Sequence, residues 1–152
     1  MLATLFEEVY MKFKLNFYRK IFFRFETREA SLTAVETFCV EVIHALNKPT
    51  INQFAKFVMI SQANAAYKVQ SLIKKGYVKK ERSETDKREY TLYVTEKFFH
   101  YYNQSSEYMH EIIQRIITRF SAEEIKAFEH ILATITNELM PEISLRKTAV
   151  PD

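Results

Sequence analysis

The chain has 152 residues, of which 47% are hydrophobic and 27% are charged, so it holds enough apolar material for one domain with a core. With one glycine, three prolines and one cysteine, it favours neither disorder nor a loop-rich β fold, and it excludes an internal disulfide. Charges are scattered through the N-terminal stretch, and no uncharged apolar run approaches about 18 residues. These features predict a soluble, cytoplasmic protein with no secretory signal and no membrane partner.

The net charge of +3 is distributed unevenly along the chain. Residues 1–49 carry a net charge of +1, residues 50–94 carry +5, and residues 95–152 carry −3. A basic middle between near-neutral and acidic ends indicates a local contact with a polyanion. The alternative is a solvated lysine-rich surface.

The N-terminal segment predicts a long helix with one apolar face. Large apolar side chains recur there at spacings of three and four, in Phe6, Tyr10, Phe13, Phe17 and Ile21. Burial within one subunit explains part of this face, but intertwining with a second copy explains it better. Residues 1–30 are therefore interpreted as an N-terminal dimerisation helix.

Three capping boxes predict further helix starts. In each box a hydroxyl can accept a hydrogen bond from the amide three residues on, while a Glu or Gln side chain reaches back. The pairs are Thr33 with Glu36, Thr50 with Gln53, and Ser121 with Glu124.

Two short helices and a longer one are expected between residues 33 and 75. The first should bury an apolar stripe and break at "NKP", residues 47–49; the stripe is Val35, Phe38, Cys39, Val42 and Leu46. The second should bury Phe54, Phe57 and Val58. A turn at Ile60 and Ser61 leads into a third helix that runs to Lys75, which makes a helix-turn-helix candidate.

Gly76, the only glycine, follows directly, where a left-handed backbone favours glycine. Residues 77–82 and 89–94 predict two strands, and "SETDK" predicts the polar turn between them. Helix, glycine, strand, charged loop and strand in this order are typical of a winged helix. Residues 31–95 are therefore expected to form a winged helix-turn-helix DNA-binding domain.

Residues 96–140 predict C-terminal dimerisation helices, and residues 141–152 lose periodicity and predict a mobile tail. The apolar repeats are Met109, Ile112, Ile113, Ile116, Ile117 and Phe120, then Ile125, Phe128, Leu132, Ile135 and Leu139. The predicted fold class is mainly α with a small β-wing: a winged helix-turn-helix flanked by N- and C-terminal dimerisation helices.

The helix over residues 61–75 carries a polar face without an acid. A helical wheel turns Ala65, Val69 and Leu72 inward. Asn and Gln can bond adenine, whereas Tyr, Ser and Lys can reach bases or phosphates. An ordinary solvated face is the alternative. The candidate DNA contacts here are Ser61, Gln62, Ala63, Asn64, Tyr67, Lys68, Ser71 and Lys74.

Three features occur together at a fixed spacing: the stretch "ISQANAAYKVQSLIKKGYV", a "DKR" that begins ten residues after Gly76, and Thr95 nine residues after Asp86. In this combination they resemble the MarR family of winged-helix transcriptional regulators. The resemblance implies that Arg88 enters a minor groove, that Asp86 orients the wing and this arginine, and that Lys87 lies near phosphate. Two positions depart from the family: Tyr67 replaces a common arginine, and Phe98 replaces a usual glycine.

The resemblance also implies a sequence-specific regulator of transcription, a repressor, that binds a pseudo-palindromic operator in double-stranded DNA as a homodimer. A small-molecule effector, an oxidant or a metal would modulate it. The main alternative is a winged-helix module for protein–protein interaction that does not bind DNA. No catalytic motif has supporting context, so an enzyme is not expected.

The sensing residues are open to two interpretations each. Cys39 lies on the apolar stripe of its helix and is expected to be an inert buried thiol instead of a redox sensor. The histidines have no metal-binding spacing, so no metal or other cofactor is expected; they are His44, His100, His110 and His130. The run "FFHYY" at 98–102 lines a pocket or belongs to the core.

Overall fold

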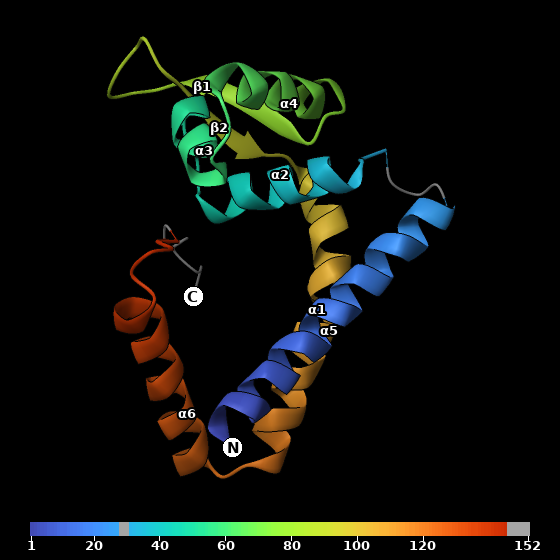
Figure 1. Cartoon of the computed structure of the whole chain (residues 1–152), viewed down its shortest axis with the longest axis vertical. Coiled ribbons are helices and arrows are strands. Elements are labelled where there is room, and N and C mark those ends of the chain that lie inside the picture. The colour runs from blue at the N-terminus through green and yellow to red at the C-terminus, as the bar shows by residue number, and fades with distance from the viewer. Residues whose placement is uncertain (28–30, 146–152) are drawn as a thin grey trace. The chain divides into compact units, whose positions relative to one another are not determined.

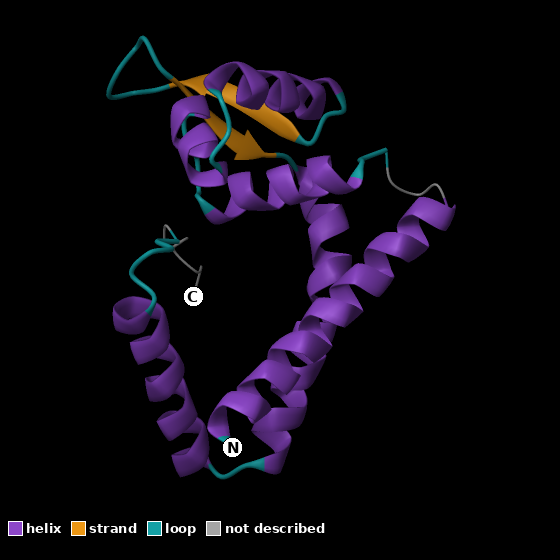
Figure 2. Ribbon diagram, viewed as in Figure 1, coloured by secondary structure: helices purple, strands orange, loops and turns teal. Residues whose placement is uncertain are grey.

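The structure, a computed structural model, describes residues 1–27 and 31–145 and is mainly helical with one small sheet (Figures 1 and 2). This confirms the predicted fold class. The elements are α1 (Leu2–Thr27), α2 (Ala34–Ala45), α3 (Ile51–Val58), α4 (Gln62–Lys74), β1 (Val78–Arg82), β2 (Tyr90–Val94), α5 (Glu96–Arg119), α6 (Ala122–Thr134) and a π-helix, η1 (Ile135–Leu139).

The chain divides into two compact units. One comprises residues 1–26 and 103–144, and the other is built around residues 27–102. The predicted assignment of the terminal segments to dimerisation stays a prediction. Residues 146–152 of the predicted mobile tail lie outside the described residues.

All three capping boxes are confirmed. In α2, for example, the amide of Glu36 donates to Thr33 Oγ1 (3.2 Å) and the amide of Thr33 donates back to Glu36 Oε2 (2.8 Å). The same reciprocal pair begins α3 at Thr50 and α6 at Ser121. Each box satisfies two backbone donors that the first helical turn leaves without partners, so these helix starts are determined locally.

Gly76 has the left-handed backbone that its position predicts, with a φ of +82°. Its amide donates to the carbonyl of Ile73 (3.0 Å), and the amide of Tyr77 donates to the carbonyl of Leu72 (3.0 Å). These two bonds form a Schellman motif at the end of α4, with the buried side chains of Tyr77 and Leu72 as its apolar pair. The motif turns the chain from α4 directly into β1.

The wing is an antiparallel pair in which Val78 faces Val94 and Arg82 faces Tyr90. Its strands lie within one residue of the predicted ranges. An isolated β-bridge pairs Thr50 with Thr91, and the amide of Leu92 donates to the carbonyl of Pro49 (2.7 Å). These contacts connect β2 to the start of α3. The sheet therefore has a fixed position relative to the helix-turn-helix.

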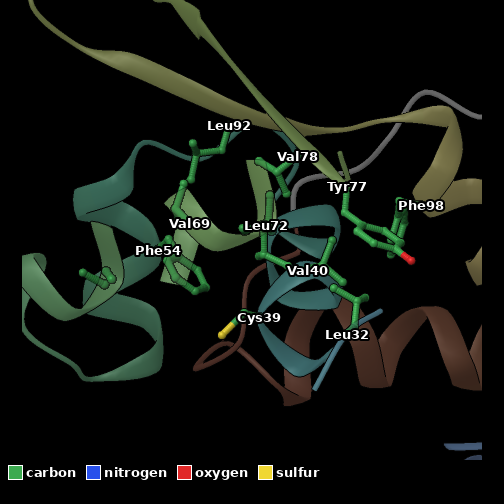
Figure 3. Packing of buried hydrophobic residues seen from close by; sticks show 13 residues of the cluster. Leu32, Cys39, Val40, Phe54, Val69, Leu72, Tyr77, Val78, Leu92 and Phe98 are labelled. Atoms are coloured by element: carbon green, nitrogen blue, oxygen red, sulfur yellow. The ribbon is translucent and has the colours of Figure 1, made fainter. Parts of the chain in front are cut away.

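The core of this unit lies between α2, α3, α4 and the sheet (Figure 3). The inward residues predicted for α4 are confirmed, since Ala65, Val69 and Leu72 are fully buried. The buried cluster is Leu32, Cys39, Val40, Ile43, Phe54, Ala55, Ala65, Val69, Leu72, Tyr77, Val78, Leu92 and Phe98.

The predicted stripe of α2 was partly wrong. Cys39 is buried, but Val35 is 51% exposed and Phe38 is 45% exposed. The buried face is instead Glu36, Thr37, Cys39, Val40 and Ile43. A stripe drawn through apolar residues alone misses this face, because Glu36 and Thr37 are buried polar residues.

The prediction for α3 was wrong at one residue. Phe54 is buried and Val58 packs against the core, but Phe57 is 41% exposed. Ala55 is buried as well, so the inward arc of α3 extends from Phe54 towards Ala55 and away from Phe57.

The other unit leaves much apolar surface exposed. Phe13 of α1 contacts Tyr108 of α5 edge-on, with ring centroids 5.7 Å apart, and Ile21 is buried. By contrast, Phe6 and Tyr10 are 60% and 58% exposed, and α6 has no buried residue. Within residues 1–27 and 31–145, no helix combines the length and apolar character that a membrane crossing needs.

Candidate nucleic-acid interface

The recognition helix candidate α4 begins with a rigid turn. Met59 ends α3 in the left-handed region (φ 58°), and Ser61 caps α4 by accepting a hydrogen bond from the amide of Asn64 (3.2 Å). The first turn of α4 holds no acidic residue, so its positive dipole end is open to anions. This places a polar, anion-compatible surface at the start of the helix.

Most of the residues predicted to contact DNA lie at the surface. On α4, Lys68 and Ser71 are half-buried, while the exposed ones are Ser61, Gln62, Ala63, Asn64, Tyr67 and Lys74. In the wing Asp86, Lys87 and Arg88 are all exposed. Both parts belong to one compact unit and are joined through Gly76 and β1.

The side chain of Ser71 is hydrogen-bonded to another residue of the protein. Its hydroxyl donates to Oε1 of Glu36 (2.5 Å), and the ammonium of Lys75 donates to Oε2 of the same carboxylate (2.7 Å). Burial alone would raise the pKa of Glu36, but the hydrogen bonds from Lys75, Ser71 and the Thr33 amide lower it to about 2. The carboxylate therefore stays ionised and ties α4 to α2.

The wing turn is shaped by Asp86. Its Oδ1 accepts from the backbone amide of Arg88 (2.9 Å), and its own amide donates to Ser83 Oγ (3.3 Å). The amide of Ser83 donates to the carbonyl of Glu89 (2.8 Å) and closes the turn. Asp86 thus contacts the backbone at Arg88, and the exposed guanidinium extends from a constrained turn.

The structure adds cations that the sequence-based prediction left out. Lys79, Lys80 and Arg82 are exposed along β1, and Nζ of Lys80 lies 5.3 Å from the ring centroid of Tyr90. The +5 charge of residues 50–94 was the available signal, because it includes these three residues. With Lys87 and Arg88 they give the wing five exposed cations, which stand among four exposed acids, Glu81, Glu84, Asp86 and Glu89.

The C-terminal end of α4 is closed by the residues that begin α5. Thr95 Oγ1 donates to the carbonyl of Gly76 (2.6 Å), and Nζ of Lys97 donates to the carbonyl of Lys75 (2.8 Å). Nζ of Lys97 also lies 4.6 Å from the ring centroid of Tyr77. A cation at the negative end of the helix dipole stabilises α4 in place.

Cys39 and His44 are both in apolar surroundings. Cys39 is only 7% exposed, and burial raises the pKa of its thiol, as expected for an unreactive cysteine. The His44 ring lies 5.1 Å from the ring of Phe98 and 4.9 Å from that of Tyr102, and burial lowers its pKa. Phe98 belongs to the core.

Among the residues that the structure describes, no group of three His, Cys, Asp or Glu side chains could hold a metal ion. Within residues 1–27 and 31–145, none of the four histidines therefore belongs to a cluster of possible metal ligands.

A two-stranded wing that follows an acid-free α4 on a helix-turn-helix defines the winged-helix class of fold. The MarR family model matches residues 32–90, which span α2 to the first residue of β2. This part of the chain is similar to the MarR family of transcription regulators. No curated protein sequence matches the chain.

Solved structures agree in fold. FabT of Streptococcus pneumoniae, in complex with DNA, is 21% identical over 94% of this chain and 100% of its own, with a TM-score of 0.61. A mutant MepR from a multidrug-resistant Staphylococcus aureus clinical isolate is 15% identical over 92% and 98%, with a TM-score of 0.65. S. aureus MepR bound to ethidium bromide is 15% identical over 92% and 97%, with a TM-score of 0.57.

Proposed function

We propose that this chain is a transcriptional regulator of the MarR family that binds double-stranded DNA sequence-specifically, as a homodimer, on a pseudo-palindromic operator. The observation that carries the proposal is the exposed, acid-free face of α4 beside the cations of the wing. In such a docking, α4 lies in the major groove while Arg88 extends towards the adjacent minor groove. Two copies related by a two-fold axis would read half-sites about 10 base pairs apart.

The finer role that we propose is that of a repressor released by a small molecule. FabT in complex with DNA and MepR bound to ethidium bromide support this proposal by analogy of fold. The protein would act in the compartment that contains its DNA, which we propose is the cytoplasm. A module that only binds proteins would not require basic residues on the wing or the exclusion of acids from α4.

The exposed apolar faces of the terminal helices predict a homodimer. Four large apolar side chains are at least half exposed in the single chain: Phe6 and Tyr10 on α1, Ile117 on α5, and Phe120 directly after α5. Burial of such faces against a second copy is the main source of free energy for association. Analytical ultracentrifugation at micromolar concentration should give about twice 18.1 kDa. A monomer that bound DNA tightly would contradict this architecture.

The wing and the helix are expected to contribute differently to DNA binding. Arg88→Ala should weaken binding to every duplex and reduce the salt dependence by about one unit, because one phosphate-region cation is lost. Asn64→Ala should weaken binding to the best site by about 1–3 kcal/mol and leave non-specific binding nearly unchanged. Anisotropy titrations at several salt concentrations, on specific and scrambled duplexes, measure both effects.

Arg88→Lys is the matched control for these titrations. It keeps the charge and should therefore keep the salt dependence, while it loses the guanidinium that suits a narrow groove. Wild-type affinity of Arg88→Ala for both duplexes would show that the wing does not contact DNA.

A further inference from the structure

The N-terminal end of α4, with the turn before it, presents an unusual set of side chains for a DNA-reading surface. Residues 59–67, "MISQANAAY", contain no charged residue. Gln62 and Asn64 are exposed amides, while Met59 and Tyr67 are 90% and 77% exposed. In a docked helix-turn-helix this end of the recognition helix contacts the base edges, so these side chains would determine the base preference.

Met59 is exposed at a turn with an unusual backbone conformation. It occupies the left-handed region (φ 58°), which is uncommon for a residue with a side chain, and its 90% exposure shows that its own chain does not cover it. The amide of Met59 donates to the carbonyl of Lys56 (3.3 Å), and that of Ile60 donates to the carbonyl of Ala55 (3.1 Å). The turn is thus hydrogen-bonded, with Met59 exposed to solvent three residues before α4 begins.

The cations of α4 and of its C-cap are half-buried, distant from this end or already hydrogen-bonded. Lys68 is half-buried, Lys74 is in the last turn, and Lys75 donates to Glu36 at 2.7 Å. No arginine occurs in α4. Guanine presents two acceptors in the major groove, and its commonest specific partner is a bidentate arginine or lysine. The base-reading end of α4 has no such partner to offer.

The exposed amide and apolar side chains at this end of α4 match an A·T base pair. Adenine offers a donor and an acceptor that an Asn or Gln amide can bond in bidentate fashion, and thymine offers a methyl group that favours apolar contacts. We propose that α4 selects half-sites with A·T base pairs at the centre of its major-groove contact. Gln62 and Asn64 read adenine, and Met59 and Tyr67 contact thymine methyl groups. This proposal rests on the proposed DNA-binding function.

The first experiment is selection of bound duplexes from a random library with the purified 152-residue chain. The expected result is A·T at the base pairs that α4 protects in each half-site. Enrichment of G·C at those base pairs would overturn the inference while leaving DNA binding intact. No enrichment of any duplex at low salt would instead overturn the proposed function itself.

The second experiment isolates the methyl contact. Replacing one thymine of the selected half-site by deoxyuridine removes only a methyl group, and should weaken wild-type binding about four-fold if that methyl is buried by Met59. Met59→Ala should bind the two duplexes equally, whereas Met59→Leu should again prefer thymine. If every thymine in the protected half-site tolerates the replacement with wild-type protein, the assigned methyl contacts are wrong.

Discussion

Glu36→Ala is expected to destabilise the chain by about 3 kcal/mol. The carboxylate is buried, and it accepts from Ser71 at 2.5 Å, Lys75 at 2.7 Å and the Thr33 amide at 2.8 Å. Removing one partner of a buried ion pair leaves the other groups without compensation, which costs about 3–5 kcal/mol. The lower end applies because the Lys75 side chain is 30% exposed and can turn to water.

The same network predicts a dependence of stability on pH. The pKa of Glu36 is lowered from 4.5 to about 2, so the folded state binds this proton less readily than the unfolded chain. The stabilisation is therefore complete above about pH 4.5 and is lost as the pH falls towards 2. Urea unfolding at fixed protein concentration between these pH values should show this loss in the wild type and a weaker loss in Glu36→Gln.

Glu124→Gln is the matched control for the Glu36 variants. Glu124 occupies the same capping-box position at the start of α6, but it is exposed and accepts from the backbone and hydroxyl of Ser121. It should therefore lower stability clearly less than Glu36→Gln does. Equal losses for the two variants would show that the capping box, and not the contact between α2 and α4, explains the effect.

Phe98→Ala is expected to cost about 3–5 kcal/mol, the usual range for an aromatic side chain removed from a core. Phe98 is fully buried, and its ring stacks on that of Tyr102 at 5.3 Å and lies 5.1 Å from His44. Its neighbour Phe99 is 40% exposed, so Phe99→Ala should cost much less. Chemical denaturation of the two variants, at equal protein concentration, gives the comparison.

His44 provides a second readout of the Phe98 variant. Burial lowers the pKa of His44 from its ordinary 6.5. Opening a cavity beside the ring should let water reach it and move this pKa back towards 6.5, which NMR titration can follow. An unchanged pKa in a destabilised variant would mean that Phe98 is not what desolvates His44.

Much of the winged helix could be predicted without coordinates, because its boundaries are encoded by local interactions. The hydroxyls of Thr33 and Thr50 satisfy amides three residues away, and Gly76 alone accepts a left-handed backbone at no steric cost. The strands around the wing turn follow from alternation and from turn residues such as Asp86. Each of these signals acts within a few residues, so reading along the chain is sufficient.

The candidate DNA surface was predictable only in part. The exposed positions of Asn64 and Tyr67 follow from helical periodicity, and that of Arg88 follows from its place in the polar turn of the wing. The engagement of Ser71 by Glu36 does not, since the two residues are 35 positions apart. The exposure of Met59 depends on a turn geometry that a methionine does not predict.

The amino-acid sequence by itself determined the helix starts, the turn at Gly76 and the wing, because short-range hydrogen bonds and backbone preferences specify them. Only the tertiary structure decided which face of α2 is buried. An ionised Glu36 can be buried only because Ser71 and Lys75, which lie in another segment of the chain, donate hydrogen bonds to its carboxylate. The same contact decided which polar residues of α4 remain available to DNA. Burial of a charge depends on partners that folding brings together, and these partners cannot be predicted from the periodicity of one helix.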